Sequence, residues 1–221
     1  MEQKFLYHAL ASGVSGHITL PFQHVIEVQA PSALPFTGGY STSRAENFRY
    51  EHILSFSSAH TVATGSESGR SFNTLATATI EGLNILNMVT ADRVTARLAS
   101  KYTKDTGDQS ATFAGSHFQN LRIGGYPVEV KIDPEQLKSS RRSERVQFGT
   151  FAAPIDLESR WGLERLDDGA IHIPEFGRIY LAEFLVTGCY RSITMFRVVL
   201  GCAMEGLLAG PHASTNGEGM P

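Results

Sequence analysis

The sequence predicts an all-β protein, built most simply as a β-sandwich of mainly antiparallel strands. Apolar and polar residues alternate at a period of two in many short runs, the pattern of strands with one buried face. Glycine is abundant, at 21 of 221 residues, and Gly-bounded runs recur at the spacing typical of sandwich strands. The length suits one large domain, so we assign residues 1–210 to a single β domain.

The N-terminal third is expected to form short strands joined by turns. Residues 5–10, 17–20 and 25–29 are β-prone runs separated by turn-forming residues. Two prolines and a Gly-Gly pair mark residues 30–43 as a loop. Residues 63–73 are polar with two glycines, which predicts an exposed hairpin loop.

The stretch 74–99 contains the clearest strand pattern. It opens with TLATATIEG, where small or apolar residues alternate with threonines, and later alternates Val94, Ala96 and Leu98 with Arg93, Thr95 and Arg97. An amphipathic helix over 91–100 is the alternative, since Ala, Arg and Leu favour helices. The density of β-branched residues favours the strand. A β-solenoid over 74–98 is the architectural alternative to the sandwich.

The next segment predicts a hairpin. Gly124 and Gly125 lie between alternating apolar runs, and a two-residue type I′ turn needs a positive φ at both positions. Pro127 places the second strand at an edge, because proline cannot donate to a sheet ladder.

Residues 133–169 form a charged insertion in this interpretation, with one or two short helices. Asp133, Pro134 and Glu135 suit the start of one helix, as N-cap, first helical residue and first-turn acid. Residues 156–166 suit a second helix. Residues 211–221 show no periodicity, and we expect a flexible tail or docking arm there.

Charge composition argues against a nucleic-acid partner. Lys and Arg number 19 against 22 Asp and Glu, a net charge of −3 with His neutral, whereas nucleic-acid binding surfaces are strongly basic. No window approaches 18 uninterrupted apolar residues, so no transmembrane segment is expected. His8 interrupts the first apolar run, so we expect no N-terminal secretion signal and, by default, a cytoplasmic location.

Catalytic and cofactor motifs are missing from the sequence. It contains no nucleotide-binding glycine loop, no G-x-S-x-G elbow and no H-E-x-x-H pair, so we predict neither enzyme activity nor a cofactor or metal. The eight histidines lack metal-ligand spacing. Convergence of His8, His52, His60 or His172 in space would instead indicate an unrecognised hydrolase.

Cys189 and Cys202 are too few for a disulfide scaffold. Two buried free thiols are the simpler expectation, and a cross-strand disulfide is the alternative. Glu183 interrupts an apolar run, so its side chain either faces solvent or pairs within an interface with an arginine such as Arg197.

Two groups of residues are candidates for a ligand or subunit interface. Trp161, Tyr126 and Tyr190 are possible platforms for a sugar ring or anchors for a partner. The basic cluster Arg141, Arg142 and Arg145 suits a solvated loop, an anionic partner or a salt bridge between subunits.

Several strings resemble the bacterial choice-of-anchor P family. They are FQNLRIGGYPV (118–128), DGAIHIPEFGRIYLAEF (168–184), SITMFRVVLG (192–201) followed by Glu205-Gly206, and IEGLNILNMVTADRVTARL (80–98). The resemblance implies an all-β, surface-exposed bacterial protein without established enzymatic chemistry. The chain departs from the family because we detect neither a secretion signal nor a C-terminal anchor, and because of its charged insertion.

Together these features lead to three functional hypotheses. The first is a structural or self-assembling protein, a homo-oligomeric subunit of a surface fibre, layer or shell, because unblocked edge strands invite strand addition. The second is a carbohydrate- or small-ligand-binding β-sandwich. The third is the unrecognised hydrolase.

Overall fold

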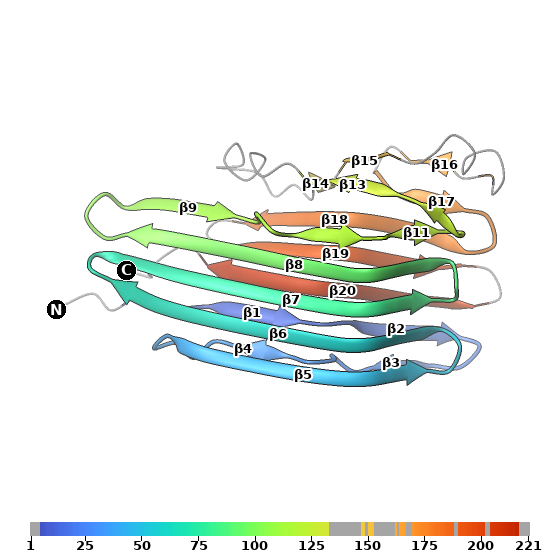
Figure 1. Cartoon of the computed structure of the whole chain (residues 1–221), viewed down its shortest axis with the longest axis horizontal. Coiled ribbons are helices and arrows are strands. Elements are labelled where there is room, and N and C mark those ends of the chain that lie inside the picture. Colours follow the sequence, from blue (N-terminus) through green and yellow to red (C-terminus); the bar gives the residue numbers. More distant parts are fainter. Residues whose placement is uncertain are drawn as a thin grey trace.

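The computed structural model describes residues 5–132, 147–148, 150–152, 162, 164–166, 169–187, 190–201 and 204–216. These residues form two antiparallel sheets packed face to face, as Figure 1 shows, and no helix occurs among them. The predicted all-β sandwich is confirmed.

Sheet A has ten strands and is formed by the two ends of the chain. Its main path runs through β16 (Glu164–Arg165), β17 (Ile171–Ile173), β18 (Gly177–Thr187), β19 (Tyr190–Leu200), β20 (Glu205–Asn216), β1 (Ala9–Ser12) and β4 (Ser32–Ala33). Off this path, β14 pairs with β18, and β2 pairs with both β20 and β3; their bounds are Gln147–Phe148 for β14, Ser15–Leu20 for β2 and His24–Ile26 for β3.

Sheet B has eight strands and is formed by the middle of the chain. Its path runs through β12 (Tyr126–Pro127), β11 (Arg122–Ile123), β8 (Val89–Thr103), β7 (Ser71–Ile85), β6 (Leu54–Ser68) and β5 (Gly39–Tyr50). The strands β9 (Asp108–Thr112) and β10 (His117–Gln119) also pair with β8. A separate two-stranded sheet joins β13 (Glu129–Lys131) to β15 (Thr150–Ala152).

The core between the sheets combines small residues with large ones. The inner face of sheet B presents fully buried alanines: Ala59, Ala63, Ala76, Ala78 and Ala96. The strands β1 and β20 of sheet A pack on β6 and β7 with the buried residues Ala9, Ala11, Leu208 and Ala213, while the larger Ile193, Phe196 and Val198 of β19 lie on the side of β8. Small side chains on facing strands let the two sheets approach closely. The alternation of small residues and threonines in residues 74–79 is therefore a packing pattern as well as a strand pattern.

One transverse row interrupts the alternation in sheet B. Five adjacent strand segments each turn two consecutive residues outward at the same level, in pairs that are all polar or glycine: Glu46-Asn47, Ser57-Ser58, Glu81-Gly82, Asp92-Arg93 and Gln119-Asn120. Asn47, Gly82 and Asn120 have positive φ there. All five segments make this change at the same level, so the pairing register between strands is kept. Beyond the row, the residues that point into the core shift by one position; β7, for example, buries residues 74, 76, 78 and 80 before the row and residues 83 and 85 after it.

Several sequence predictions for the middle of the chain are confirmed. Residues 91–100 lie in β8, which rules out the helix alternative. Gly124 and Gly125 have φ of 58° and 86° and connect β11 to β12, and β12 lies at the edge of sheet B. The solenoid alternative is wrong, since β7 and β8 form an antiparallel hairpin.

Other predictions need correction. The expected loop over residues 63–73 is mostly strand, because β6 continues to Ser68 and β7 begins at Ser71. The expected tail over 211–221 is wrong for residues 211–216, which complete β20 between β19 and β1 and bury Ala213.

The prediction of a second helix over residues 156–166 is also wrong at its C-terminal end. Glu164 and Arg165 form strand β16, which pairs antiparallel with β17 at the end of sheet A. Backbone hydrogen bonds to β17 replace those that a helix would have made within the segment. The first helix, at 133–135, lies outside the described residues.

Candidate functional site

A partly buried ion pair lies on the outer face of sheet A. Arg197 on β19 donates from Nε to Oε2 of Glu183 at 2.8 Å and from Nη2 to Oε1 at 2.6 Å. The guanidinium carbon lies 3.6 Å from the centre of the Tyr180 ring, which adds a cation–π contact. Glu183 is 9% exposed, so its solvent-facing alternative is wrong. Its pairing with Arg197 is confirmed within one chain, and a place for the pair in a subunit interface stays a prediction.

The ion pair stabilises the charged forms of Glu183 and Arg197. The hydrogen bonds from Arg197 to Glu183 raise the pKa of the arginine above its ordinary value. Both oxygens of the carboxylate accept from one planar guanidinium, which is the strong bidentate arrangement. A carboxylate held in this way is suited to fixing β18 against β19, and poorly suited to passing a proton to a substrate.

A hydroxyl and an imidazole continue the same row across sheet A. The cross-strand register places Glu183 opposite Thr194 and Thr194 opposite His212. Thr194 Oγ1 lies 2.9 Å from Nδ1 of His212. A hydroxyl beside a histidine resembles the start of a nucleophilic dyad, but such a dyad needs a third group to orient the base. The carboxylate of this row is already committed to Arg197.

Stability should depend on pH through His212, because its burial lowers its pKa below the ordinary value of 6.5. The unfolded chain then binds a proton at a higher pH than the folded chain does. The contribution of neutral His212 to stability is therefore present above pH 6.5 and is lost as the pH falls through that value towards the lower folded pKa.

Urea unfolding measured between pH 7.5 and pH 5 checks this expectation. The variant His212→Asn places an uncharged polar side chain beside Thr194. Its free energy of unfolding should fall less steeply with decreasing pH than that of the natural chain. Equal slopes in the two proteins would assign the acid sensitivity to other groups.

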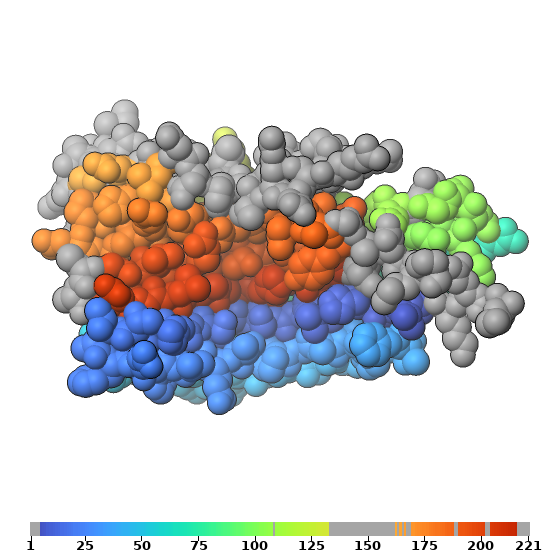
Figure 2. Space-filling model, turned by 180° about the vertical axis from the view of Figure 1, so that it is seen from behind, coloured from blue at the N-terminus to red at the C-terminus, as the bar shows by residue number. Residues whose placement is uncertain are grey.

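An apolar patch lies beside this cluster on the same face of sheet A. We call it the apolar shelf, and its apolar members are Leu20, Phe22, Val25, Val28 and Leu207. The exposed His17 of β2 lies between Val25 and Leu207 in the same sheet. Figure 2 shows this face, where the N-terminal segments in blue lie against β20 in red. A shallow hollow of about 510 Å³ is lined by residues of β2, β3 and β20 together with Glu27 and Val28 of the loop after β3.

Sheet B presents a different outer face, rich in hydroxyl groups. Alternate residues of three central strands point outward there: Ser58, His60, Val62, Thr64 and Ser66 of β6, Asn73, Leu75, Thr77, Thr79 and Glu81 of β7, and Arg93, Thr95, Arg97, Ala99 and Lys101 of β8. Two hollows occupy this face, one at each end of the row of β8 residues.

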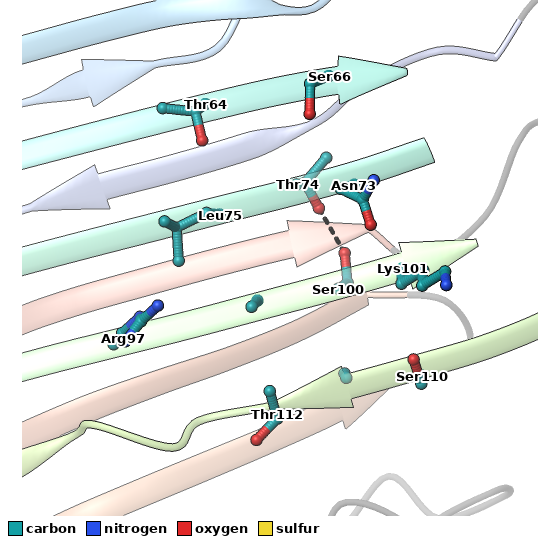
Figure 3. A pocket seen from close by; sticks show the side chains of 12 residues that line it. Thr64, Ser66, Asn73, Thr74, Leu75, Arg97, Ser100, Lys101, Ser110 and Thr112 are labelled. Carbon is teal, nitrogen blue, oxygen red and sulfur yellow. Dashed lines mark hydrogen bonds between the residues drawn. The ribbon is translucent and has the colours of Figure 1, made fainter. Parts of the chain in front are cut away.

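The first hollow is an open groove of about 470 Å³ across β6, β7, β8 and β9, shown in Figure 3. Its floor includes Leu75 and Ala99, and two cations, Arg97 and Lys101, stand on β8. Its other polar residues are Thr64, Ser66, Asn73, Thr74, Ser100, Ser110 and Thr112. No carboxylate is among the lining residues in this described part of the chain.

The second hollow contains charges that neutralise each other. Arg93 Nη2 lies 2.6 Å from Oε1 of Glu81, and Ser58 donates to the other oxygen at 3.1 Å. The hydrogen bonds from Arg93 and Ser58 lower the pKa of Glu81. His60 and His117 belong to the same row, but no group of three metal-ligating side chains occurs within the described residues.

Of the sequence-predicted site residues, the described ones, Tyr126 and Tyr190, lie on different sheets. Tyr126 lies on β12 at the edge of sheet B, whereas Tyr190 begins β19 in sheet A, 6.4 Å from the His8 ring. Their roles stay predictions. Trp161, Arg141, Arg142, Arg145, Cys189 and Cys202 lie outside the described residues.

The four histidines whose convergence would have indicated a hydrolase lie on separate elements. His8 precedes β1, His52 lies in the turn before β6, His60 is on the outer face of sheet B, and His172 is on β17 of sheet A. The groove residues Arg97 and Lys101 were not singled out as a site from the sequence. The sequence does contain a pattern that indicates them. Residues 93, 95, 97, 99 and 101 are alternate residues of one predicted strand and therefore share one face, which places Arg97 and Lys101 together.

Comparison with known proteins adds a family but no activity. No helix among the described residues is both long and apolar enough to cross a membrane. No curated protein and no solved structure matches the chain. A family model described as "Domain of unknown function (DUF8256)" matches residues 5–154, which is more than half of the chain. The chain therefore belongs to the DUF8256 family.

Proposed function

We propose that this protein is a non-enzymatic, self-associating β-sandwich that serves as a subunit of a bacterial surface assembly. The observation that supports self-association is the apolar shelf on sheet A. The resemblance to choice-of-anchor P proteins supports the surface location and the structural role.

The exposure of the shelf residues is unusual for a folded chain in isolation. Phe22 is 80% exposed and Val25 is 64% exposed, and the other three members, Val28, Leu20 and Leu207, lie between 42% and 47%. Single exposed apolar side chains are common, but contiguous ones mark interaction sites. These five come from β2, β3, β20 and the loops beside β3.

A second copy of the chain is the partner that fits this surface. The shelf lies at an edge of sheet A, where β3 pairs only with β2 among the described residues. A two-fold contact sets one patch against itself, so a patch with few charges meets little repulsion. Among the described residues, Glu27 is the one carboxylate that lines the hollow, and the exposed Glu205 lies opposite Leu20 at the end of the shelf.

The polar cluster beside the shelf supports a structural role rather than catalysis. Glu183 and Arg197 saturate each other, and they hold together the two strands that continue towards the shelf through β20. The ion pair would therefore stiffen the face on which the second copy docks.

Light scattering after size-exclusion chromatography tests the proposal. The natural chain should elute at a multiple of 24.1 kDa over a range of concentrations. Leu207→Glu places a charge in the centre of the shelf and should weaken the dimer by about 100-fold or more, because an unpaired charge is costly to bury.

Phe36→Glu is the matched control. Phe36 is 69% exposed but is not part of the shelf, so the same change of chemistry there should leave the oligomer intact. A monomeric natural chain at high concentration would contradict self-association, and equal effects of the two variants would place the interface elsewhere.

A further inference from the structure

We infer that the groove on the outer face of sheet B binds an acidic glycan, an extended polyhydroxylated chain whose sugars bear carboxylates. This site lies on the opposite sheet from the shelf, so it goes beyond self-association. The inference rests on the two cations of the groove, on its hydroxyl lining and on the shape and continuity of the face.

The two cations of the groove differ from the other described arginines of sheet B, whose side chains all have an acceptor within the chain. Arg44, Arg70 and Arg93 each form an ion pair with a carboxylate of the same sheet or its turns. Arg49 and Arg122 instead donate to the backbone carbonyls of Glu51 and Gly125. Within the described part of the chain no carboxylate pairs with Arg97 or Lys101. The groove therefore offers two cations that are available to an anionic ligand.

The spacing of these cations selects an extended ligand. Arg97 and Lys101 are four residues apart on one face of β8, which separates their Cα atoms by about 13 Å. One compact anion does not span that distance, whereas a chain with repeated carboxylates does. A guanidinium also binds a carboxylate through two parallel hydrogen bonds.

The hydroxyl groups of the groove match the uncharged part of a sugar. Ser110 on β9 lies beside Lys101, and Thr64 and Ser66 lie on β6, on the far side of Leu75 and Asn73 of β7, as Figure 3 shows. A hydroxyl both donates and accepts, as a sugar hydroxyl does. Leu75 and Ala99 supply a narrow apolar floor for the C–H face of a sugar ring.

The same groove is poorly suited to single-stranded nucleic acid. Sequence-independent binding of single strands depends on aromatic side chains on which bases stack, and no aromatic residue lines this groove in the described structure. An acidic glycan needs no such stacking platform.

The groove continues into a longer track along β8. Thr95 and Arg93 extend the outward row from Arg97 towards the second hollow, where Thr79 and Ser58 add further hydroxyls. A linear polymer can therefore follow the strand direction beyond the groove, so longer oligosaccharides should bind more tightly than short ones.

Titration calorimetry on the full chain at low salt tests the inference. The probes are alginate and polygalacturonate oligosaccharides, a neutral dextran oligosaccharide of equal length, and oligo(dT). We expect binding to one or both uronates and none to dextran. Arg97→Gln and Lys101→Gln should each weaken binding by about tenfold, the loss typical of a hydrogen bond to a charged group.

Two further variants separate a glycan site from ion exchange. Arg178→Gln removes an exposed charge from sheet A and should leave the affinity unchanged. Thr64→Val removes one groove hydroxyl without changing charge or volume, and should weaken binding about threefold. Thermal melts of all four variants should coincide with that of the natural chain.

Three outcomes would overturn the assignment. The first is the failure of both uronates to bind. The second is oligo(dT) binding as tightly as the uronates, which would indicate a general polyanion surface. The third is equal losses for Arg178→Gln and Arg97→Gln, which would remove the groove from the interaction. Light scattering on the same samples reports self-association separately, so the two proposals fail independently.

Discussion

Replacing Gly210 by alanine is expected to destabilise the protein by about 3 kcal/mol or more, through strain and overpacking together. Gly210 lies in β20 with φ of +154°, which side chains rarely adopt. A Cβ atom there would collide with the carbonyl oxygen of Gly13 and lie 2.9 Å from Cα of Val14. Both obstacles are backbone, so neither can rotate away. Urea denaturation measures the loss as a lower midpoint at an unchanged slope.

Gly69→Ala is the control for backbone strain alone. Gly69 has φ of +63° in the turn between β6 and β7, and a Cβ atom there meets nothing within 4 Å. This variant should cost about 1 kcal/mol, the ordinary penalty of a left-handed conformation. Equal losses at the two positions would show that the close approach of β20 to Gly13 and Val14 tolerates a side chain.

The central hairpins of sheet B were predictable because their burial follows the sequence. Burial alternates without interruption over residues 74–80, and in the partner strand Val94, Ala96 and Leu98 are buried while Arg97 is exposed. The Gly124-Gly125 turn was predictable for a local reason, since few other residues adopt positive φ twice in succession. These features depend on neighbours within a few positions.

The C-terminal strand was missed because its stability is not local. Pro211, Ala213, Ser214 and Thr215 are small or turn-forming, a composition that usually indicates a loop. They form a strand because β19 and β1 supply ladder partners on both sides, and those partners come from opposite ends of the chain. Tertiary pairing overrides local preference at such central strands.

The candidate sites were only partly predictable for a related reason. The outward face of β8 follows from alternation, but the groove appears only when β6, β7 and β9 are placed beside it. Glu183 and Arg197 are 14 residues apart, so their pairing depends on the β18–β19 register. The shelf was invisible because Leu20, Phe22 and Val25 look like core residues in the sequence.

Removing Arg197 is expected to cost more stability than removing its partner Glu183. The two side chains differ in exposure, at 31% for Arg197 and 10% for Glu183. Arg197→Met keeps the packing of the stem on Tyr180 but leaves a buried carboxylate without its counter-ion, at a cost of about 3 kcal/mol. Glu183→Gln leaves a guanidinium that reaches water, at a cost of about 1 kcal/mol.

A double-mutant cycle measured by urea unfolding separates the pair from its surroundings. The double variant Glu183→Gln, Arg197→Met should be more stable than Arg197→Met alone, because it no longer buries an unpaired charge. A double variant whose loss equals the sum of the two single losses would show that the side chains do not interact. The comparison of the two single variants is the sharper test. If both side chains were fully exposed to water, Arg197→Met and Glu183→Gln would lower the free energy of unfolding by the same amount.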